Sequence, residues 1–504
     1  MNNNELENIQ ITENESYTQS YTHKNPNEYN GEVLGNQVNT PKNTSTKSVY
    51  IESYGCQMNF SDSEVVASIL QKEGYQTTTS LTEADLILVN TCSIREKAEQ
   101  TVRNRLTHFQ RLKKQNKGVK VGVLGCMAER LKHKFLEEEK IVDIVVGPDA
   151  YKDLPNLLEE AEANREAVNV ILSKEETYGD IAPVRLSSNG VSAFVTITRG
   201  CDNMCTFCVV PFTRGRERSR DPKSILQEIE NLAKEGYKEV TLLGQNVDSY
   251  LWYGGGLKKD FKNASSLQQK TAVDFSKLLQ LVAEAHPKMR IRFSTSNPQD
   301  MSVDVLHTMA AYDNICKYIH LPVQSGSNRI LKKMNRLHSR EEYFELIKNI
   351  REIIPGCGIS HDMITGFPTE TEADHQDTLD LMRFVKYDYG FMFAYSERPG
   401  TMAARKIEDD VPQAVKKRRL NEIIDLQQEH SKYRTQQFIG KTVCVLIEKT
   451  SKRSDGFWSG RTTQNTVAVF PKENYQIGDL VDIRIDSVTT ATLIGTPQGY
   501  SDRI

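Results

Sequence analysis

Over the first part of the chain, the pattern of apolar and polar positions shows two kinds of stretch that alternate. Short apolar runs are each followed by a stretch in which apolar residues recur at helical spacing; the runs are 48–54, 84–90 and 119–125, and the helical stretches are 61–72, 94–114 and 129–138. This alternation predicts an α/β domain with a parallel, doubly wound sheet. Residues 1–47 show no such period and are rich in Asn, Thr and Ser, so we expect a disordered tail there.

The strand–helix theme repeats six more times from Ser192 onward. The apolar runs of this second part are 194–198, 239–243, 290–294, 318–322, 359–364 and 391–395. Six parallel strand–helix units predict an open, partial barrel whose sites lie at the carboxyl ends of its strands. Residues 251–273 interrupt one unit with Gly, Lys, Asn and Ser, and we interpret them as a long loop.

The last part of the chain has a different pattern. Four short apolar runs, separated by turn residues, predict a small all-β barrel of OB-like size; the runs are 442–447, 466–470, 480–485 and 491–495. The expected organisation is therefore a tail followed by an N-terminal α/β domain, a partial α/β barrel, a helical connector and a β-barrel, over 1–47, 48–165, 187–417, 418–437 and 438–504.

Composition narrows the class of protein. The 504 residues carry a net charge of −3, which excludes a uniformly basic nucleic-acid binder and leaves only local basic patches. No apolar run reaches the roughly 18 residues of a membrane span, and the start of the chain has no secretory signal pattern. Nine cysteines without such a signal favour reduced thiols in the cytoplasm.

Three of these cysteines form a compact motif. Cys201, Cys205 and Cys208 come directly after an apolar run, with three and two residues between them. Three thiolates can ligate three irons of a four-iron cluster and leave the fourth iron open to a second molecule. The alternative is a structural zinc site, which normally closes with four ligands, and no fourth cysteine or histidine lies nearby in the sequence.

Three other cysteines each follow one of the first three predicted strands. Cys56, Cys92 and Cys126 are far apart in sequence, but the carboxyl ends of parallel strands meet at one edge of a sheet. The pattern therefore predicts a second three-cysteine cluster, the alternative being three ordinary buried thiols. The remaining cysteines fit neither pattern; they are Cys316, Cys357 and Cys444.

The compact motif resembles that of radical S-adenosylmethionine (SAM) enzymes, and about residues 48–500 resemble the methylthiotransferase family within that superfamily. The stretches most similar to the tRNA branch, which makes 2-methylthio-N6-isopentenyladenosine, are YGCQMNFSDSE (54–64), NTCSIR (90–95), VVPFTRGRERSR (209–220) and GQNVDSY (244–250). One departure is Asn297, where the branch has histidine, and this departure leaves a catalytic role for that position unsupported.

The resemblance implies two 4Fe-4S clusters, SAM as both methyl donor and radical source, and a C-terminal TRAM domain that binds RNA. The first three cysteines would hold an auxiliary cluster that carries a sulfur, and SAM would methylate that sulfur. A second SAM, cleaved at the cluster on Cys201, Cys205 and Cys208, would give the radical that removes hydrogen from C2 of adenine 37. We expect SAM contacts from polar residues at the barrel strand ends, namely Gln245, Ser294, Ser296, Gln324 and Ser325.

The implied partners are a tRNA anticodon stem-loop carrying N6-isopentenyladenosine, an electron donor of flavodoxin or ferredoxin type and a sulfur donor. We expect the protein itself to be a monomer. Candidate RNA contacts combine cations with an aromatic ring: Arg214, Arg216, Arg218, Lys452, Arg453, Trp458 and Arg461. Each charge run can equally be a solvated face. The rival functions are sulfur insertion into a ribosomal protein and a non-catalytic iron–sulfur regulator that binds RNA.

Overall fold

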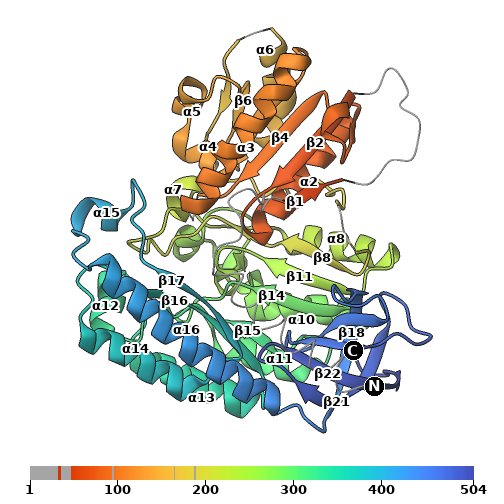
Figure 1. Ribbon diagram of the computed structural model, residues 1–504, viewed down its shortest axis with the longest axis vertical. Helices are drawn as coiled ribbons and strands as arrows, with labels where there is room; N and C mark the ends of the chain where they lie inside the picture. Colours follow the sequence, from red (N-terminus) through yellow and green to blue (C-terminus); the bar gives the residue numbers. More distant parts are fainter. Residues whose placement is uncertain (1–31, 36–46, 94–95, 164, 187–188) are drawn as a thin grey trace.

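The computed structural model describes residues 32–35, 47–93, 96–163, 165–186 and 189–504. Three parts follow one another along the chain, and Figure 1 shows the N-terminal α/β domain above the partial α/β barrel, with the small β-barrel packed beside the latter. None of the helices in these ranges is long and apolar enough to cross a membrane.

The N-terminal domain is a mostly parallel sheet with helices on both faces. Its strand order is β1 (Glu32–Leu34), β2 (Lys47–Ser53), β4 (Leu86–Thr91), β5 (Lys120–Gly125), β6 (Ile144–Val146) and β7 (Ala167–Asn169), with β3 (Tyr75–Thr77) paired to β2. Leu88 of β4 packs in one core with α2 (Gln57–Lys72) and α6 (Leu154–Glu162). Its neighbour Val89 packs in the opposite core with α3 (Glu96–Gln115), α4 (Cys126–Leu131) and α5 (His133–Glu138). The doubly wound α/β prediction is confirmed.

Two local predictions in this domain are wrong. The single helix expected over 129–138 is two helices, because Lys132 adopts a left-handed φ of 54° between α4 and α5. Within the expected tail, β1 pairs antiparallel with β2, and its Leu34 is fully buried. A strand of three residues is too short to show a hydrophobic period, so the sequence pattern did not reveal it. The other residues of the expected tail, except Gly35 and Lys47, lie outside the described ranges.

Deleting residues 1–31 and deleting residues 1–35 should therefore have different effects. The longer deletion removes Leu34 from the core, and full burial of a leucine contributes about 1.5–3 kcal/mol, so we expect a loss of that order in the free energy of unfolding. The shorter deletion keeps β1 and serves as the control. Urea unfolding measures both, and equal stabilities of the two truncations would show that β1 contributes nothing.

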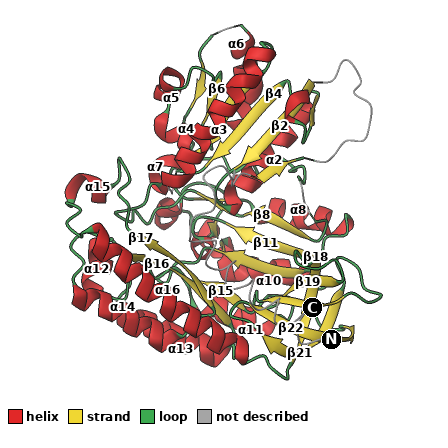
Figure 2. Ribbon diagram, viewed as in Figure 1, coloured by secondary structure: helices red, strands yellow, loops and turns green. Residues whose placement is uncertain are grey.

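The central part is a partial barrel of six parallel strands. They are β8 (Ser192–Thr196), β11 (Glu239–Leu243), β14 (Arg290–Ser294), β15 (Tyr318–His320), β16 (Gly358–Thr365) and β17 (Tyr389–Ala394). The first three and the last three each form a sheet, and the Ser296 amide joins the two by donating to the His320 carbonyl at 3.1 Å. Figure 2 shows helices along the outside, namely α8 (Pro222–Lys234), α10 (Phe275–Ala285), α11 (Val303–Ala311), α12 (Asn328–Lys333), α13 (Arg340–Ile353) and α14 (Glu372–Val385).

The stretch 251–273, expected as a long loop, has its own structure. It contains β12 (Leu251–Trp252), which pairs with β13 (Val273–Asp274), and between them a 3-10 helix (Lys258–Asn263) and α9 (Ser266–Thr271). Ser265 and Gln268 form a capping box at the start of α9. Elements of two to six residues lie below the length at which hydrophobic periodicity is visible. The remaining short elements of the barrel are β9 (Thr198–Arg199), α7 (Val210–Thr213), β10 (Arg218–Ser219), a 3-10 helix (Val247–Ser249) and α15 (Met402–Lys406).

The C-terminal part is a closed barrel, as predicted, but it has five strands where four were expected, and the additional strand carries Trp458 and Arg461. Its order is β18 (Thr442–Thr450), β19 (Phe457–Thr462), β20 (Val467–Pro471), β22 (Thr492–Tyr500) and β21 (Leu480–Val488). The connector is α16 (Gln413–Gln436), which lies against α14 and β17 and ends at the β-barrel (Figure 1). Two arginines of β14 fix the β-barrel: Arg290 and Arg292, both buried, donate to the carbonyls of Arg461 and Thr462 at 2.9 and 2.7 Å.

Candidate active site

One large cavity, of about 1750 Å³, opens between the three parts of the molecule. Its lining includes all six cysteines of the two predicted trios, together with residues from the barrel strand ends and from the C-terminal β-barrel. The structure thus brings together cysteines that lie up to 152 positions apart, from Cys56 to Cys208.

The first trio meets at the carboxyl edge of the N-terminal sheet, and two glycines allow its close approach. Gly55 precedes Cys56 with a φ of +111°, and a Cβ on it would overlap the Cβ of Cys92. Gly125 precedes Cys126 with a φ of +87°, and a Cβ there would overlap the side-chain oxygen of Asn90. Both positions therefore require glycine, because an L side chain would be strained at either φ and would collide with Cys92 or with Asn90.

The second trio lies on the loop that follows β9. Gly200 has a φ of +77° and lets this loop pack against the backbone of Arg216. The amide of Cys208 donates to the carbonyl of Cys205 at 3.0 Å, and the amide of Val210 donates to the Cys208 sulfur at 3.4 Å. Burial raises the pKa of the Cys208 thiol to about 12, so binding of a metal there has to displace a proton.

The donor set fits iron–sulfur clusters better than single ions. Within the described ranges, no group of three or more His, Cys, Asp and Glu side chains is arranged to hold one metal ion. In a four-iron cluster each thiolate ligates a different iron, so its three thiols stand further apart than ligands of one ion. Each trio supplies three soft sulfur donors around open space in the cavity, which matches a cluster with one iron free of protein ligands.

Most of the residues expected to contact SAM face this cavity. Gln245, Ser294, Ser296 and Gln324 line it, and the side-chain oxygen of Gln245 is buried without a hydrogen-bond partner among the described residues. An orphaned acceptor in the cavity that the second trio also lines fits a ligand that carries donor groups, such as an amino acid ammonium. Ser325 is fully buried and does not line the cavity; its hydroxyl accepts a hydrogen bond from the Ser327 amide at 3.2 Å.

Comparison with known proteins shows which family this chain belongs to. The Radical SAM superfamily pattern matches residues 195–382, the TRAM domain pattern 436–497 and the Uncharacterized protein family UPF0004 pattern 48–147. A tRNA-2-methylthio-N(6)-dimethylallyladenosine synthase of Christiangramia forsetii is 74% identical over 92% of this chain and 96% of its own length. The protein of that name from Flavobacterium johnsoniae is 69% identical over the same shares.

The chain belongs to the tRNA-2-methylthio-N(6)-dimethylallyladenosine synthase family. It is therefore an enzyme, a radical SAM transferase whose cofactors are 4Fe-4S clusters and SAM, as the sequence resemblance implied. A solved radical SAM methyltransferase, TsrM from Kitasatospora setae with cobalamin and a 4Fe-4S cluster bound, aligns with 71% of this chain and 74% of its own. Its sequence identity is 14% and its TM-score 0.49.

Asn297, the position at which we expect a departure from the family pattern, lies in a hydrogen-bond network with an arginine. The side-chain oxygen of Asn297 accepts a hydrogen bond from Arg336 at 3.2 Å, and the same guanidinium reaches the Cys205 sulfur at 3.6 Å. Asn297 therefore orients an arginine that touches the second trio. Sequence patterns did not single out this arginine as a cluster contact, because it lies more than 120 residues beyond the cysteine motif.

The candidate RNA contacts lie in very different surroundings. Arg214 and Arg218 are only 3% and 2% exposed, in ion pairs with Asp62 and Asp149, so they present no guanidinium to a phosphate in this structure. Arg216 is exposed and pairs with Asp202 at 2.6 Å. Of the seven candidates, only Arg216 in the central barrel and the residues of the β-barrel therefore remain available to RNA.

In the β-barrel, Lys452 and Arg453 are exposed just before β19. Trp458 is half-buried, and the ammonium of Lys472 lies over its ring, 4.1 Å from the centroid, so that face is covered. Arg461 pairs with Glu448 at 3.3 Å and lines the cavity. Among these candidates, Arg461 therefore lies at the cavity, whereas Lys452 and Arg453 lie on the exposed surface before β19.

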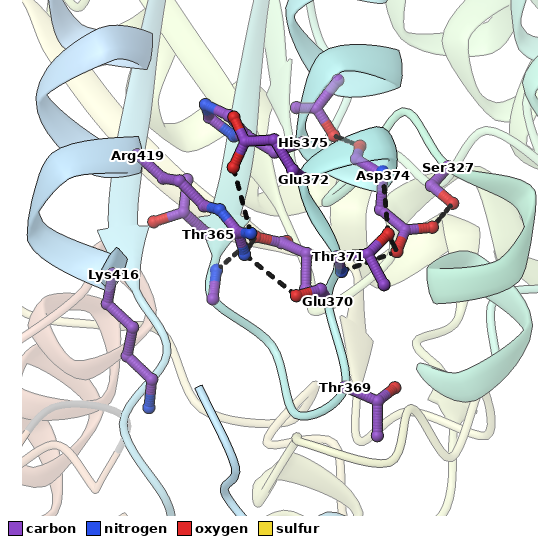
Figure 3. Close-up of polar contacts among 12 residues, drawn as sticks. Ser327, Thr365, Thr369, Glu370, Thr371, Glu372, Asp374, His375, Lys416 and Arg419 are labelled. Atoms are coloured by element: carbon purple, nitrogen blue, oxygen red, sulfur yellow. Dashed lines mark hydrogen bonds and ion pairs between the residues drawn. The ribbon is translucent and has the colours of Figure 1, made fainter. Parts of the chain in front are cut away.

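The loop between β16 and α14 is held by the connector helix, as Figure 3 shows. Arg419 of α16 donates to the Glu370 carboxylate at 2.9 Å and also pairs with Glu372. Asp374 accepts hydrogen bonds from Ser327 and Thr371, each at 2.6 Å, and these and an Arg329 ion pair lower its pKa. This loop follows Ile364, which lines the cavity, so the contacts fix the wall of the site at the end of β16.

An aromatic wall of the cavity was not predicted. Tyr318 and Tyr389 are stacked with ring centroids 5.7 Å apart, and Phe391 of the same strand is 42% exposed. All three line the cavity, and the Tyr389 hydroxyl accepts a hydrogen bond from Asn465 of the β-barrel at 2.9 Å. From sequence alone, alternating aromatic residues in a strand are expected to belong to the core. Here they line the cavity, because the partial barrel is open on that side.

Proposed function

We propose that this chain adds a methylthio group to C2 of N6-dimethylallyladenosine at position 37 of tRNA, beside the anticodon. The observation that carries the proposal is that two separate cysteine trios line one cavity, which a redox protein with one cluster would not need. When bound, the two clusters and SAM would supply the radical that removes a hydrogen from C2 and the methylated sulfur that replaces it. We assign Cys56, Cys92 and Cys126 to the auxiliary cluster, and Cys201, Cys205 and Cys208 to the radical cluster.

The protein's own contribution is positioning. A C2–H bond is neither acidic nor open to nucleophilic attack, so we assign no catalytic acid or base. The cavity would instead hold three reactants near one another. Gln245, Ser294, Ser296 and Gln324 would orient SAM beside the second trio, where the Gln245 oxygen offers an acceptor.

The aromatic wall is where the substrate base would lie. A loop base costs only a few kcal/mol to unstack and can be turned into a pocket. Phe391 offers an exposed ring next to Tyr389, and both the adenine face and the apolar dimethylallyl chain suit such a surface. Arg461 of the β-barrel lines the same cavity and can reach the backbone of the turned-out nucleotide.

Phe391→Ala should therefore weaken the binding of tRNA that carries the modified base. Base–aromatic stacking is worth about 1–3 kcal/mol, and we expect a loss in that range. Phe384→Ala is the matched control, since Phe384 is 46% exposed on α14 and does not line the cavity. Titration of labelled tRNA measures both, and equal affinities of the two variants would remove the base from this wall.

The exposed cations before β19 should set part of the salt dependence of tRNA binding. Replacing Lys452 and Arg453 with Ala would remove two phosphate contacts, and the slope of log affinity against log salt should shrink by roughly 1.4–1.8. Lys277→Ala with Lys348→Ala, on α10 and α13, is the control. An unchanged slope would exclude these contacts. Point changes are preferable to removing the β-barrel, because truncation would leave Arg290 and Arg292 without their carbonyl acceptors.

The proposal extends to partners that supply electrons and sulfur. A flavodoxin- or ferredoxin-type donor would approach the second trio at the loop 202–204, where Met204 is 39% exposed between two cysteine ligands. We also propose that the protein acts in the cytoplasm as a monomer, with all residues of the site supplied by one chain.

The test of the proposed function is mass spectrometry of tRNA nucleosides from cells with and without the gene. Loss of the 2-methylthio nucleoside, accumulation of N6-dimethylallyladenosine and rescue by the intact gene are the expected results. Unchanged tRNA with an altered ribosomal protein would favour the ribosomal-protein alternative. Unchanged tRNA with no SAM cleavage by the purified protein would favour the non-catalytic regulator.

A further inference from the structure

Arg214 belongs to the central barrel but reaches the cysteines of the N-terminal domain. Its Nε donates to the Cys126 sulfur at 3.3 Å, and its Nη2 donates to the side-chain oxygen of Asn59 at 2.8 Å. The same Nη2 lies 2.9 Å from the Asp62 carboxylate. The side chain is 3% exposed, so these contacts fix its orientation almost completely.

One nitrogen of this guanidinium has no partner. The Nη1 of Arg214 is buried without a hydrogen-bond acceptor among the described residues. An unmade hydrogen bond on a buried cation costs more than one on a neutral group, so such a donor normally faces an acceptor. The neighbouring Nε already touches a cysteine that we assign to the auxiliary cluster, and that cluster's sulfides are the acceptors that the cavity would bring within reach.

Arg214 also connects the two trios through a very short segment. Cys208, the last cysteine of the second trio, lies six residues before it, and α7 (Val210–Thr213) fills the interval. The Val210 amide donates to the Cys208 sulfur at one end of α7, and Arg214 contacts Cys126 at the other. The distance between the two trios is therefore set by one helical turn and one side chain.

We propose that Arg214 is a positioning residue of the auxiliary cluster, which hydrogen-bonds Cys126 and a cluster sulfur and fixes that cluster relative to the radical cluster. The inference rests on the proposed assignment of the first trio. A cation held against cluster sulfurs stabilises the more negative, reduced form and so raises the reduction potential. Partners that orient the ligands of a metal site typically contribute 10–100-fold to metal affinity.

The neighbouring arginine provides a matched control. Arg199 is equally buried and donates to the other oxygen of Asp62 at 2.7 Å and to the Pro148 carbonyl at 2.9 Å. No contact with a cysteine is recorded for it among the described residues. Arg199→Gln therefore disturbs the same interdomain ion network without removing a hydrogen bond to the cluster.

The experiment uses the full chain with Cys201, Cys205 and Cys208 changed to Ala, so that the auxiliary cluster is observed alone. Arg214→Gln, Arg214→Lys and Arg199→Gln are compared in this background by iron content, by resistance to an iron chelator and by an EPR-monitored redox titration. We expect Arg214→Gln to lower the potential and to weaken iron retention about 10–100-fold. The potential and the iron retention of Arg214→Lys should lie between those of Arg214→Gln and the parent. Those of Arg199→Gln should equal the values of the parent.

Equal behaviour of Arg214→Gln and Arg199→Gln, whether both lose the cluster or both keep it unchanged, would overturn the role of Arg214. Complete loss of iron in Arg214→Gln alone would support it, since the control shares the ion network. A parent that binds no iron would instead overturn the auxiliary site itself, so the failure of this inference and the failure of the proposed function are distinguishable.

Discussion

Changing Cys201, Cys205 and Cys208 to Ala should abolish SAM cleavage completely and remove about four of about eight irons from the anaerobically reconstituted protein. The reason is that these thiols are the only protein ligands that we assign to the cluster with which SAM would react, and a cluster with no protein ligand cannot be retained in the cavity. Iron analysis and detection of 5′-deoxyadenosine after reduction measure the two effects. Tight tRNA binding should remain, because the aromatic wall and the β-barrel are untouched.

The control for this variant uses the cysteines outside both trios. Cys316, Cys357 and Cys444 are all buried and do not line the cavity. Their replacement by Ala should leave the iron content and SAM cleavage at the level of the unmodified protein. Residual SAM cleavage in the first variant, or equal losses of iron in both variants, would contradict the assignment of the radical cluster.

Changing Cys56, Cys92 and Cys126 to Ala should separate SAM cleavage from product formation. Iron should again fall by about half, and SAM cleavage should persist because the second trio lies on the loop after β9, in another domain. Formation of the 2-methylthio nucleoside should fall below detection, since the site that we assign to the transferred sulfur is lost. Full iron content in this variant would show that the first trio consists of ordinary buried thiols.

The first trio could be predicted from the order of strands, helices and cysteines along the sequence. Three apolar runs of similar length, each followed by a helix and each ending at a cysteine, define a parallel sheet, and such a sheet brings its carboxyl ends together. The second trio was predictable from spacing alone. In both cases the informative residues are close in sequence to the element that positions them.

The arginines of the segment 214–220 show what sequence could not provide. Their charges suggest an RNA surface, but Arg214 and Arg218 are buried because carboxylates from distant parts of the chain compensate them; these are Asp62 and Asp149. Such ion pairs form only where distant parts of the chain meet at the domain interface, so no local sequence pattern predicts them. The aromatic wall was missed for a related reason, since a strand's exposed side depends on whether the barrel closes over it.

The most direct test of the account is conversion of a defined substrate by the purified, reconstituted protein. tRNA carrying N6-dimethylallyladenosine is incubated with SAM and a reductant, and its nucleosides are analysed by mass spectrometry, in parallel with the two cysteine-trio variants. We predict the 2-methylthio product from the intact protein alone. Of the two variants, only the one that lacks the first trio should still cleave SAM. An intact protein that cleaves SAM but leaves this tRNA unchanged, or a first-trio variant that still forms the product, would contradict it.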